Sequence, residues 1–279
     1  MLKRPASGTG ANQCAPRGPR AADPIALARR DLKQPLPRRF FKEAAAAERG
    51  GSFVLLLDGR LAKTPAGNPI ALPALAAAEA VASEWAAQGE RLDWAAMPMT
   101  RIVHSAIDGV VRQLAATAAD ITKYAATDLV CYRAEGPRKL VEAQAAAWYP
   151  VLAFARKKLG AVFVCTEGVM FVEQPAAACA AVAEAVARIA VAGEAAPFAL
   201  AALHVMTTLA GSVLIALAAA HGELAPEDAW RAAHVDEDFE IEAWGEDAEA
   251  LARRQAQWRE FAAAARLLKL VAADTQPGS

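Results

Sequence analysis

Short apolar runs broken by turn residues mark the region 38–72. The strings RRFFKEA, SFVLLLDGRLAKTP and NPIAL follow one another there. Asp58-Gly59, between FVLLL and RLAKT, is a strong hairpin signal because both turn positions favour a positive φ angle. The pattern therefore predicts a small antiparallel sheet over residues 38–72.

A helical pattern dominates the rest of the chain. One helix is predicted to open at Leu72-Pro73, with Pro73 in its first turn, and to run through LAAAEAVASEWAAQG to its end at Gly89. The exception is GAVFVCTEGVMFVEQP, whose β-branched and aromatic runs around Glu167-Gly168 predict a short hairpin inserted between helices. Further helices are expected over 100–132, 137–159, 175–191, 197–220 and 226–271, the last with a break near Gly245.

These patterns predict an α+β fold, with a small antiparallel strand-rich N-terminal domain at 38–99 and a larger, mainly α-helical domain at 100–275. Residues 1–37 mix Pro, Gly, Ser and Arg without apolar periodicity, which is typical of a flexible basic extension. The same composition also suits a mitochondrial transit peptide. The heavy use of Ala and Arg favours a plain extension of a bacterial protein.

Composition and charge narrow the class of protein. Apolar residues make up 55% of the 279, enough for a large core, and the many alanines favour helices. Residues 1–39 carry nine Lys and Arg against two acids, whereas the rest carries 21 against 29. Nucleic acid is therefore not expected as a partner, because the folded body is acidic. The four cysteines lack paired spacing, which favours a reducing compartment.

The longest apolar stretch, residues 205–220, spans 16 positions and contains Thr207, Thr208 and Ser212. A bilayer crossing needs about 20 apolar residues. We therefore expect a buried core helix and no stable membrane insertion.

The usual motifs of catalysis and cofactor binding are absent from the sequence. It contains no GxxxxGK[ST] loop, no GxGxxG and no GxSxG, so we predict no cofactor and no catalytic residue. His234, with Glu237 and Asp238 on one helical face, is the best metal candidate. Chance pairing on a polar helix face is the commoner origin of such a set, so no metal site is predicted.

The run VDEDFEIEAWGEDAEA, residues 235–250, holds eight acids in sixteen positions. In a helix, several acids fall at i and i+4, each pair costing about 0.2–0.5 kcal/mol. In one interpretation Arg231, Arg253 and Arg254 neutralise these acids, with Glu249 and Arg253 as the plainest i,i+4 pair. In the other, the run forms an acidic surface with aromatic anchors for a basic partner.

The second interpretation assigns partner binding to Glu237, Glu240, Glu242, Trp244 and Glu246. At 100° per residue, Glu237, Glu240 and Trp244 share one stripe, and Glu242 and Glu246 share a neighbouring one. Phe239 or Ile241 is expected to pack the same helix onto the body.

The motifs resemble those of a known family, the assembly chaperones for the alpha subunit of the F-type ATP synthase catalytic head, found in mitochondria and alphaproteobacteria. The family's pattern has a glutamine where this chain has Glu240. The matching stretches are RFFKEA at 39–44, LDGRLAKTPAGNPIALP at 57–73, EWAAQGE at 84–90, MPMTRIVHSAID at 97–108, YAATDLVCYRA at 124–134, QAAAWYPVL at 144–152, LHVMTTLAGS at 203–212 and DEDFEIEAWGEDAEALARR at 236–254.

The resemblance implies a soluble molecular chaperone that is no enzyme. It would bind the free, unassembled alpha subunit, prevent its aggregation and promote assembly of the catalytic head, in the bacterial cytoplasm or, for a eukaryotic source, the mitochondrial matrix. Two alternatives stay open: an enzyme of unknown class with a metal near His234, and a membrane-associated scaffold using the basic extension and the apolar helix around Leu214.

Overall fold

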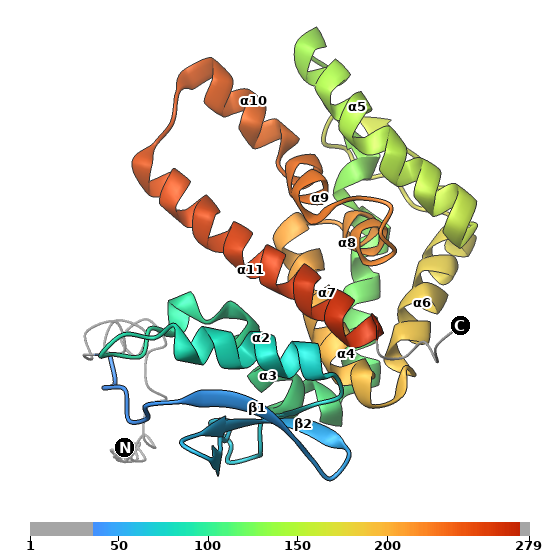
Figure 1. Cartoon of the computed structure of the whole chain (residues 1–279). Helices are drawn as coiled ribbons and strands as arrows, with labels where there is room; N and C mark the ends of the chain where they lie inside the picture. Colours follow the sequence, from blue (N-terminus) through green and yellow to red (C-terminus); the bar gives the residue numbers. More distant parts are fainter. Residues whose placement is uncertain (1–35, 274–279) are drawn as a thin grey trace, which may run out of the picture. The chain divides into compact units, whose positions relative to one another are not determined.

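The computed structural model describes residues 36–273, and the part from Arg38 onward forms one compact unit (Figure 1). Its architecture is the predicted α+β fold, with a small antiparallel sheet followed by a largely helical body. The predicted extension lies outside the described residues except for Leu36 and Pro37. The division at residues 99 and 100 stays a prediction.

The sheet is built around β2 (Ser52–Leu57), which pairs antiparallel with β1 (Ala44–Arg49), β3 (Arg60–Leu61) and β4 (Ala71–Leu72). The predicted turn at Asp58-Gly59 is confirmed, with φ angles of 48° and 76°. Asp58 also anchors the strand ahead of it, since its Oδ1 accepts the backbone N–H groups of Lys42 and Glu43, both at 2.9 Å. These bonds hold the pKa of the Asp58 carboxyl below its usual value.

Helix α2 (Leu75–Ala86) covers this sheet and buries Val81 and Trp85. It is tied to α3 (Pro98–Asp108) through Glu84, whose carboxylate accepts the N–H groups of Met99 at 2.8 Å and Thr100 at 2.7 Å. These are donors of the first turn of α3, which have no partner within the helix, so Glu84 serves as a cap supplied from another helix. A short 3-10 turn, η1 (Trp94–Ala96), connects the two.

The helical body is centred on α7 (Ala196–Ala210) and α8 (Val213–Ala220), whose residues are largely buried. Figure 1 shows α11 (Ala248–Ala273) running across the body between α10 (Val235–Trp244) and the part that contains α2. The surrounding helices are α4 (Leu114–Thr122), α5 (Arg138–Phe154) with a following π turn η5 (Ala155–Leu159), α6 (Ala176–Ala190), α9 (Pro226–Ala233), α10 (Val235–Trp244) and α11 (Ala248–Ala273).

Three of the predicted helices are interrupted where no break was predicted, and in 226–271 this interruption lies at His234, between α9 and α10. The stretch 197–220 bends at Gly211, which has a φ of 62°, and the predicted helix over 100–132 breaks into shorter pieces. Besides α3 and α4, those pieces are η2 (Val110–Arg112), η3 (Lys123–Thr127) and η4 (Leu129–Cys131).

A buried carboxylate joins the last part of the stretch 100–132 to the break in the stretch 197–220. Asp128, which follows η3, accepts hydrogen bonds from the Ser212 hydroxyl at 2.6 Å and from the Leu214 N–H at 3.1 Å, at the start of α8. Asp128 and Ser212 are fully buried. Burial raises the pKa of Asp128 to about 6.

The predicted hairpin around Glu167-Gly168 is wrong. Only β6 (Thr166–Glu167) forms there, and it pairs in parallel with β5 (Tyr132–Arg133). The local β propensity is real, but the pairing partner comes from a distant part of the chain. The loop closes on itself through Gln174, whose side chain bonds both the N–H and the C=O of Val164 at 2.9 Å.

The apolar stretch 205–220 lies in the core, as expected, with Leu214 fully buried. Within residues 36–273, a single helix long and apolar enough to cross a membrane is not found. One pair passes the length and composition test together, Ala176–Ala190 with Gly193–Ala210, but it is bent by 109°.

Candidate functional site

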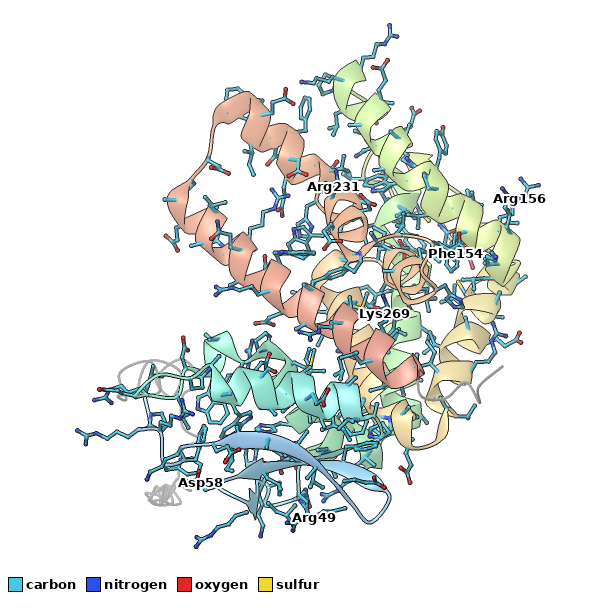
Figure 2. All side chains as sticks on the ribbon, viewed as in Figure 1. Arg49, Asp58, Phe154, Arg156, Arg231 and Lys269 are labelled. Atoms are coloured by element: carbon cyan, nitrogen blue, oxygen red, sulfur yellow. The ribbon has the colours of Figure 1, made fainter. Side chains whose placement is uncertain are left out.

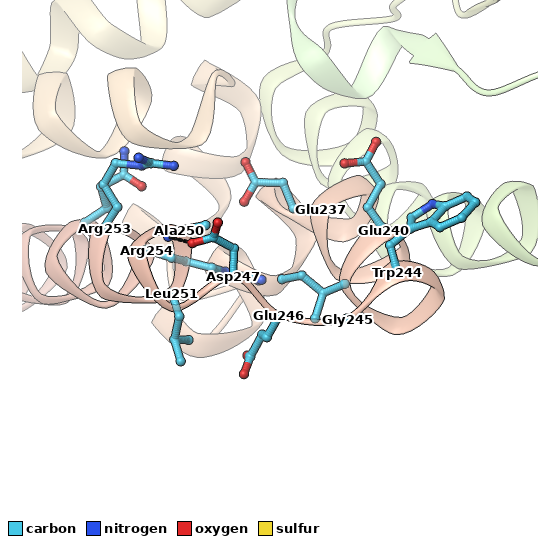
Figure 3. A pocket seen from close by; sticks show the side chains of 12 residues that line it. Glu237, Glu240, Trp244, Gly245, Glu246, Asp247, Ala250, Leu251, Arg253 and Arg254 are labelled. Carbon is cyan, nitrogen blue, oxygen red and sulfur yellow. Dashed lines mark hydrogen bonds between the residues drawn. The ribbon is translucent and has the colours of Figure 1, made fainter.

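The acidic run occupies α10, the turn after it and the first residues of α11. A groove of about 400 Å³ lies between these two helices (Figure 3). Helix α10 packs against α5 and α9, and none of its residues is fully buried. Most of the circumference of α10 is therefore at the surface of the protein. The groove is lined by Glu237, Glu240, Ile241, Trp244, Gly245, Glu246, Asp247, Ala250, Leu251, Arg253, Arg254 and Gln257.

Five of the eight acids have hydrogen-bond or ion-pair partners in the described structure. Asp236 accepts from Gln144 Nε2 at 2.7 Å, and Glu242 pairs with Lys139, so both tie α10 to α5. The remaining three serve the other helix: Asp238 pairs with Arg254, Glu249 pairs with Arg253 at 3.6 Å, and Asp247 accepts the N–H groups of Glu249 and Ala250 at the start of α11.

The other three acids, Glu237, Glu240 and Glu246, have no hydrogen bond or ion pair within the described part of the chain. All three line the groove, together with Trp244, whose surface is 89% exposed. Figure 3 shows Glu240 and Trp244 on the same side of α10, while Glu246 points away from them. The groove thus presents unpaired carboxylates beside an exposed aromatic ring.

The structure brings together four of the five residues predicted to bind a partner and separates the fifth. Glu237, Glu240 and Trp244 line the groove from one stripe of α10 as predicted, whereas Glu246, which follows the turn at Gly245, lines it but points away from Glu240 and Trp244. Glu242 is not among the groove's lining residues. Two positions after Glu240, it lies about 200° around the helix and faces Lys139 instead.

Neutralisation of the acids by arginines occurs in part. Arg253 and Arg254 take up Glu249 and Asp238 as expected, whereas Arg231 pairs with Asp228 in its own helix. Lys139 lies 103 residues from Glu242 in the chain, so no local pattern could have indicated it. Phe239 or Ile241 was predicted to pack α10 onto the body, and the structure leaves both side chains half-buried.

Two backbone features fix the turn between α10 and α11. Gly245 has φ 89° and ψ 173°, a conformation reserved almost entirely for glycine, and it stops α10 directly after Trp244. Asp247 then begins α11 as an N-terminal cap. The backbone hydrogen bonds from Ala250 and Glu249 hold the pKa of Asp247 below its usual value.

His234, the residue considered for a metal, is engaged inside the protein. Its Nδ1 lies 2.8 Å from the Trp230 carbonyl oxygen, and its ring lies 3.7 Å from the Trp230 ring. Over residues 36–273, no group of three or more His, Cys, Asp or Glu side chains is placed to hold a metal ion.

Sequence reasoning missed a second group of residues, in the strand-rich part, of which Phe40 and Leu61 are exposed and Trp85 is buried. Phe40, Leu61 and Trp85 lie together at a groove beside the Asp58-Gly59 turn. The doublet Phe40-Phe41, just before β1, is the signal in the sequence, since two successive residues of an extended segment point to opposite sides. Phe41 is buried and Phe40 is exposed.

Comparisons with known proteins agree with one another. The family model described as ATP12 chaperone protein matches residues 38–156. The crystal structure of the Atu1473 protein from Agrobacterium tumefaciens, a putative chaperone by its description, is similar with a TM-score of 0.80 and 43% identity, covering 90% of this chain and 92% of that one. Atp12 from Paracoccus denitrificans is similar with a TM-score of 0.76 and 36% identity, covering 84% of this chain and 98% of that one. The structure of a point mutant of the same Paracoccus protein gives a TM-score of 0.75 at the same identity and coverage.

Proposed function

This chain belongs to the ATP12 chaperone family, and from that premise we propose that it binds the free alpha subunit of the F-type ATP synthase. It keeps the subunit from aggregating and hands it on for assembly of the catalytic head. An unassembled subunit exposes the apolar surface that its neighbour will cover, and such patches promote aggregation. A temporary partner that covers this surface performs no catalysis and needs no nucleotide.

The observation that supports a binding site is the set of unpaired carboxylates in the groove between α10 and α11. Glu237, Glu240 and Glu246 line this groove together with the exposed ring of Trp244. Carboxylates without partners steer a basic surface toward the groove, and a large aromatic side chain supplies the contact area that gives affinity. Glu242 contributes from outside the groove, by holding α10 against α5 through Lys139. The client surface is therefore basic with an apolar centre.

The acidic charge of the body and the bacterial origin of the similar structures support the setting of this activity. The partner is a protein and not nucleic acid, because the described body carries an excess of acids. The chain acts in the cytoplasm of a bacterium; for a eukaryotic source the corresponding place is the mitochondrial matrix.

The test is complex formation between the purified chain and the purified alpha subunit, followed by size-exclusion chromatography and by light scattering of the diluted subunit. The parent chain should form a complex and suppress scattering. The double variant E237K/E240K should lose both. Its matched control is E79K, an exposed acid of α2 far from the groove in sequence and without an ion pair in the described structure. Failure of the parent chain to bind the alpha subunit would end this proposal.

A further inference from the structure

A second groove, of about 650 Å³, lies in the strand-rich part of the chain at the Asp58-Gly59 turn. None of its residues belongs to the groove between α10 and α11. It is lined by Phe40, Phe41, Leu57, Asp58, Arg60, Leu61, Ala62, Lys63 and Trp85.

The apolar side of this groove is partly buried and partly open. Phe41 and Trp85 are buried, with ring centroids 5.5 Å apart. Phe40 meets Phe41 edge to face at 5.4 Å but is 70% exposed, and Leu61 is 40% exposed. Exposed aromatic surface continuous with a buried aromatic floor gains free energy when another apolar group covers it. The groove therefore suits an apolar side chain of a ligand.

The polar side of the groove offers hydrogen-bond donors and positive charge. Arg60 and Lys63 are exposed and form no ion pair within the described residues. The indole N–H of Trp85 is buried and has no acceptor there. Asp58, the one acid of the groove, already accepts two backbone N–H groups. A ligand that complements this set brings acceptors, and carboxylates in particular.

We propose that this groove binds an extended segment of a partner polypeptide in which an apolar side chain stands next to an Asp or Glu. The apolar side chain covers Phe40 and Leu61, and the carboxylate faces Arg60 and Lys63. A backbone carbonyl of the segment can reach the Trp85 indole N–H as the aromatic walls of the groove adjust. The chain's own residues 1–39 are a poor electrostatic match, because they carry nine Lys and Arg against two acids.

The chemistry of the ligand follows from the groove alone, whereas naming the partner as the alpha subunit rests on the proposed function. In that case the chaperone holds one client at two places of opposite charge, with a basic client surface at α10–α11 and an acidic segment at the second groove. Two linked contacts raise the affinity without a tighter fit at either one.

The test uses 15-residue peptides tiled across the alpha subunit, immobilised and probed with the full chain. Three variants are compared: R60E/K63E, E237K/E240K, and the control R49E. Arg49 is exposed in the same sheet but lies opposite Ser52, at the far end of β2 from Asp58 (Figure 2). We expect peptides with an apolar residue beside an acid to lose about tenfold in affinity with R60E/K63E and to keep it with R49E.

The variants separate the two proposals. If R60E/K63E binds every peptide as tightly as the parent does, but E237K/E240K loses binding to some of them, this inference fails and the proposed function stands. If the parent chain binds neither the peptides nor the whole subunit, the proposed function fails.

A second measurement places the peptide in the groove. The indole N–H signal of Trp85 in a ¹H–¹⁵N NMR spectrum of the full chain, assigned with W85F, should move downfield when the best-bound peptide is added. The signal of Trp148, which is buried and bonded to the Ala232 carbonyl, serves as the internal control. A bound peptide that leaves the Trp85 signal in place overturns the inference. A second result would also overturn it. If deleting residues 1–35 moves the Trp85 signal in the absence of peptide, the groove of the full chain holds the chain's own segment.

Discussion

Asp128 accepts a hydrogen bond of 2.6 Å from Ser212, 84 residues later in the chain, and both side chains are fully buried. The same carboxylate accepts the N–H of Leu214, and the Ser212 hydroxyl accepts that of Ile215 at 3.0 Å. The start of α8 is therefore capped by two linked side chains inside the core. The stability of the fold at the start of α8 therefore depends on the protonation state of the Asp128 carboxyl group.

We predict that this carboxyl makes stability depend on pH. Burial raises the pKa of Asp128 from 3.8 to about 6 in the folded chain. Because the folded-state pKa lies above the unfolded value, Asp128 contributes its full stability below pH 3.8. This contribution is lost as the pH rises through 6. The shift corresponds to about 3 kcal/mol.

The variant D128N removes this titration. Both proteins are unfolded with urea at pH 4 and pH 7. Between these pH values, the free energy of unfolding of the variant should rise relative to that of the parent by up to about 3 kcal/mol. Asp58, Asp108 and Asp247 have lowered pKa values, so their contributions to the stability of the fold are lost in the opposite direction, as the pH falls. Both proteins share these contributions, and the difference between variant and parent therefore isolates Asp128. Parallel pH profiles for the two proteins would rule out the role given to Asp128.

A second prediction concerns Gly245, whose φ of 89° and ψ of 173° are almost closed to other residues. The change G245A should strain the link between α10 and α11 by about 1–3 kcal/mol. Because α10 has no fully buried residue, the strain should appear locally, as faster hydrogen exchange over 235–244. The control G89A lies at a glycine without positive φ. Equal exchange in both variants would contradict the prediction.

The third prediction separates Glu240 from Glu242. Glu240 lines the groove without a partner in the described structure, whereas Glu242 forms an exposed ion pair with Lys139. E240K should slow association with the alpha subunit about tenfold at low salt, and the difference should shrink as NaCl is added. E242K should slow it less and leave the melting temperature nearly unchanged, since exposed ion pairs contribute about 0–1 kcal/mol. Stopped-flow binding decides; a larger effect of E242K would move the contact to the α5 side.

The fourth prediction compares two tryptophans. Trp148 is fully buried, and its Nε1 donates to the Ala232 carbonyl at 2.7 Å, which joins α5 to α9. W148F leaves a gap and an unsatisfied carbonyl group, so the free energy of unfolding should fall by about 2–4 kcal/mol. W244F, at a largely exposed ring, should stay within about 0.5 kcal/mol of the parent. Similar losses in urea unfolding would mean that Trp244 is covered in solution.

Local patterns in the sequence were enough to define most elements. The Asp58-Gly59 turn, α5 and α6, and the break at Gly245 each follow from residues close together in the chain. Turn preference and helix periodicity act over a few residues, so they can be read without the fold. The family, too, was recognisable from its motifs alone.

Contacts between distant residues had to come from the tertiary structure. Asp128 and Ser212 join two predicted helical stretches at the start of α8, and β5 takes β6 as a parallel partner, because pairing of distant segments outweighs local propensity. The candidate site follows the same rule. Helix periodicity placed Glu237, Glu240 and Trp244 on one face, but which acids stay unpaired depends on Lys139, Gln144 and Arg254, which only folding brings to α10.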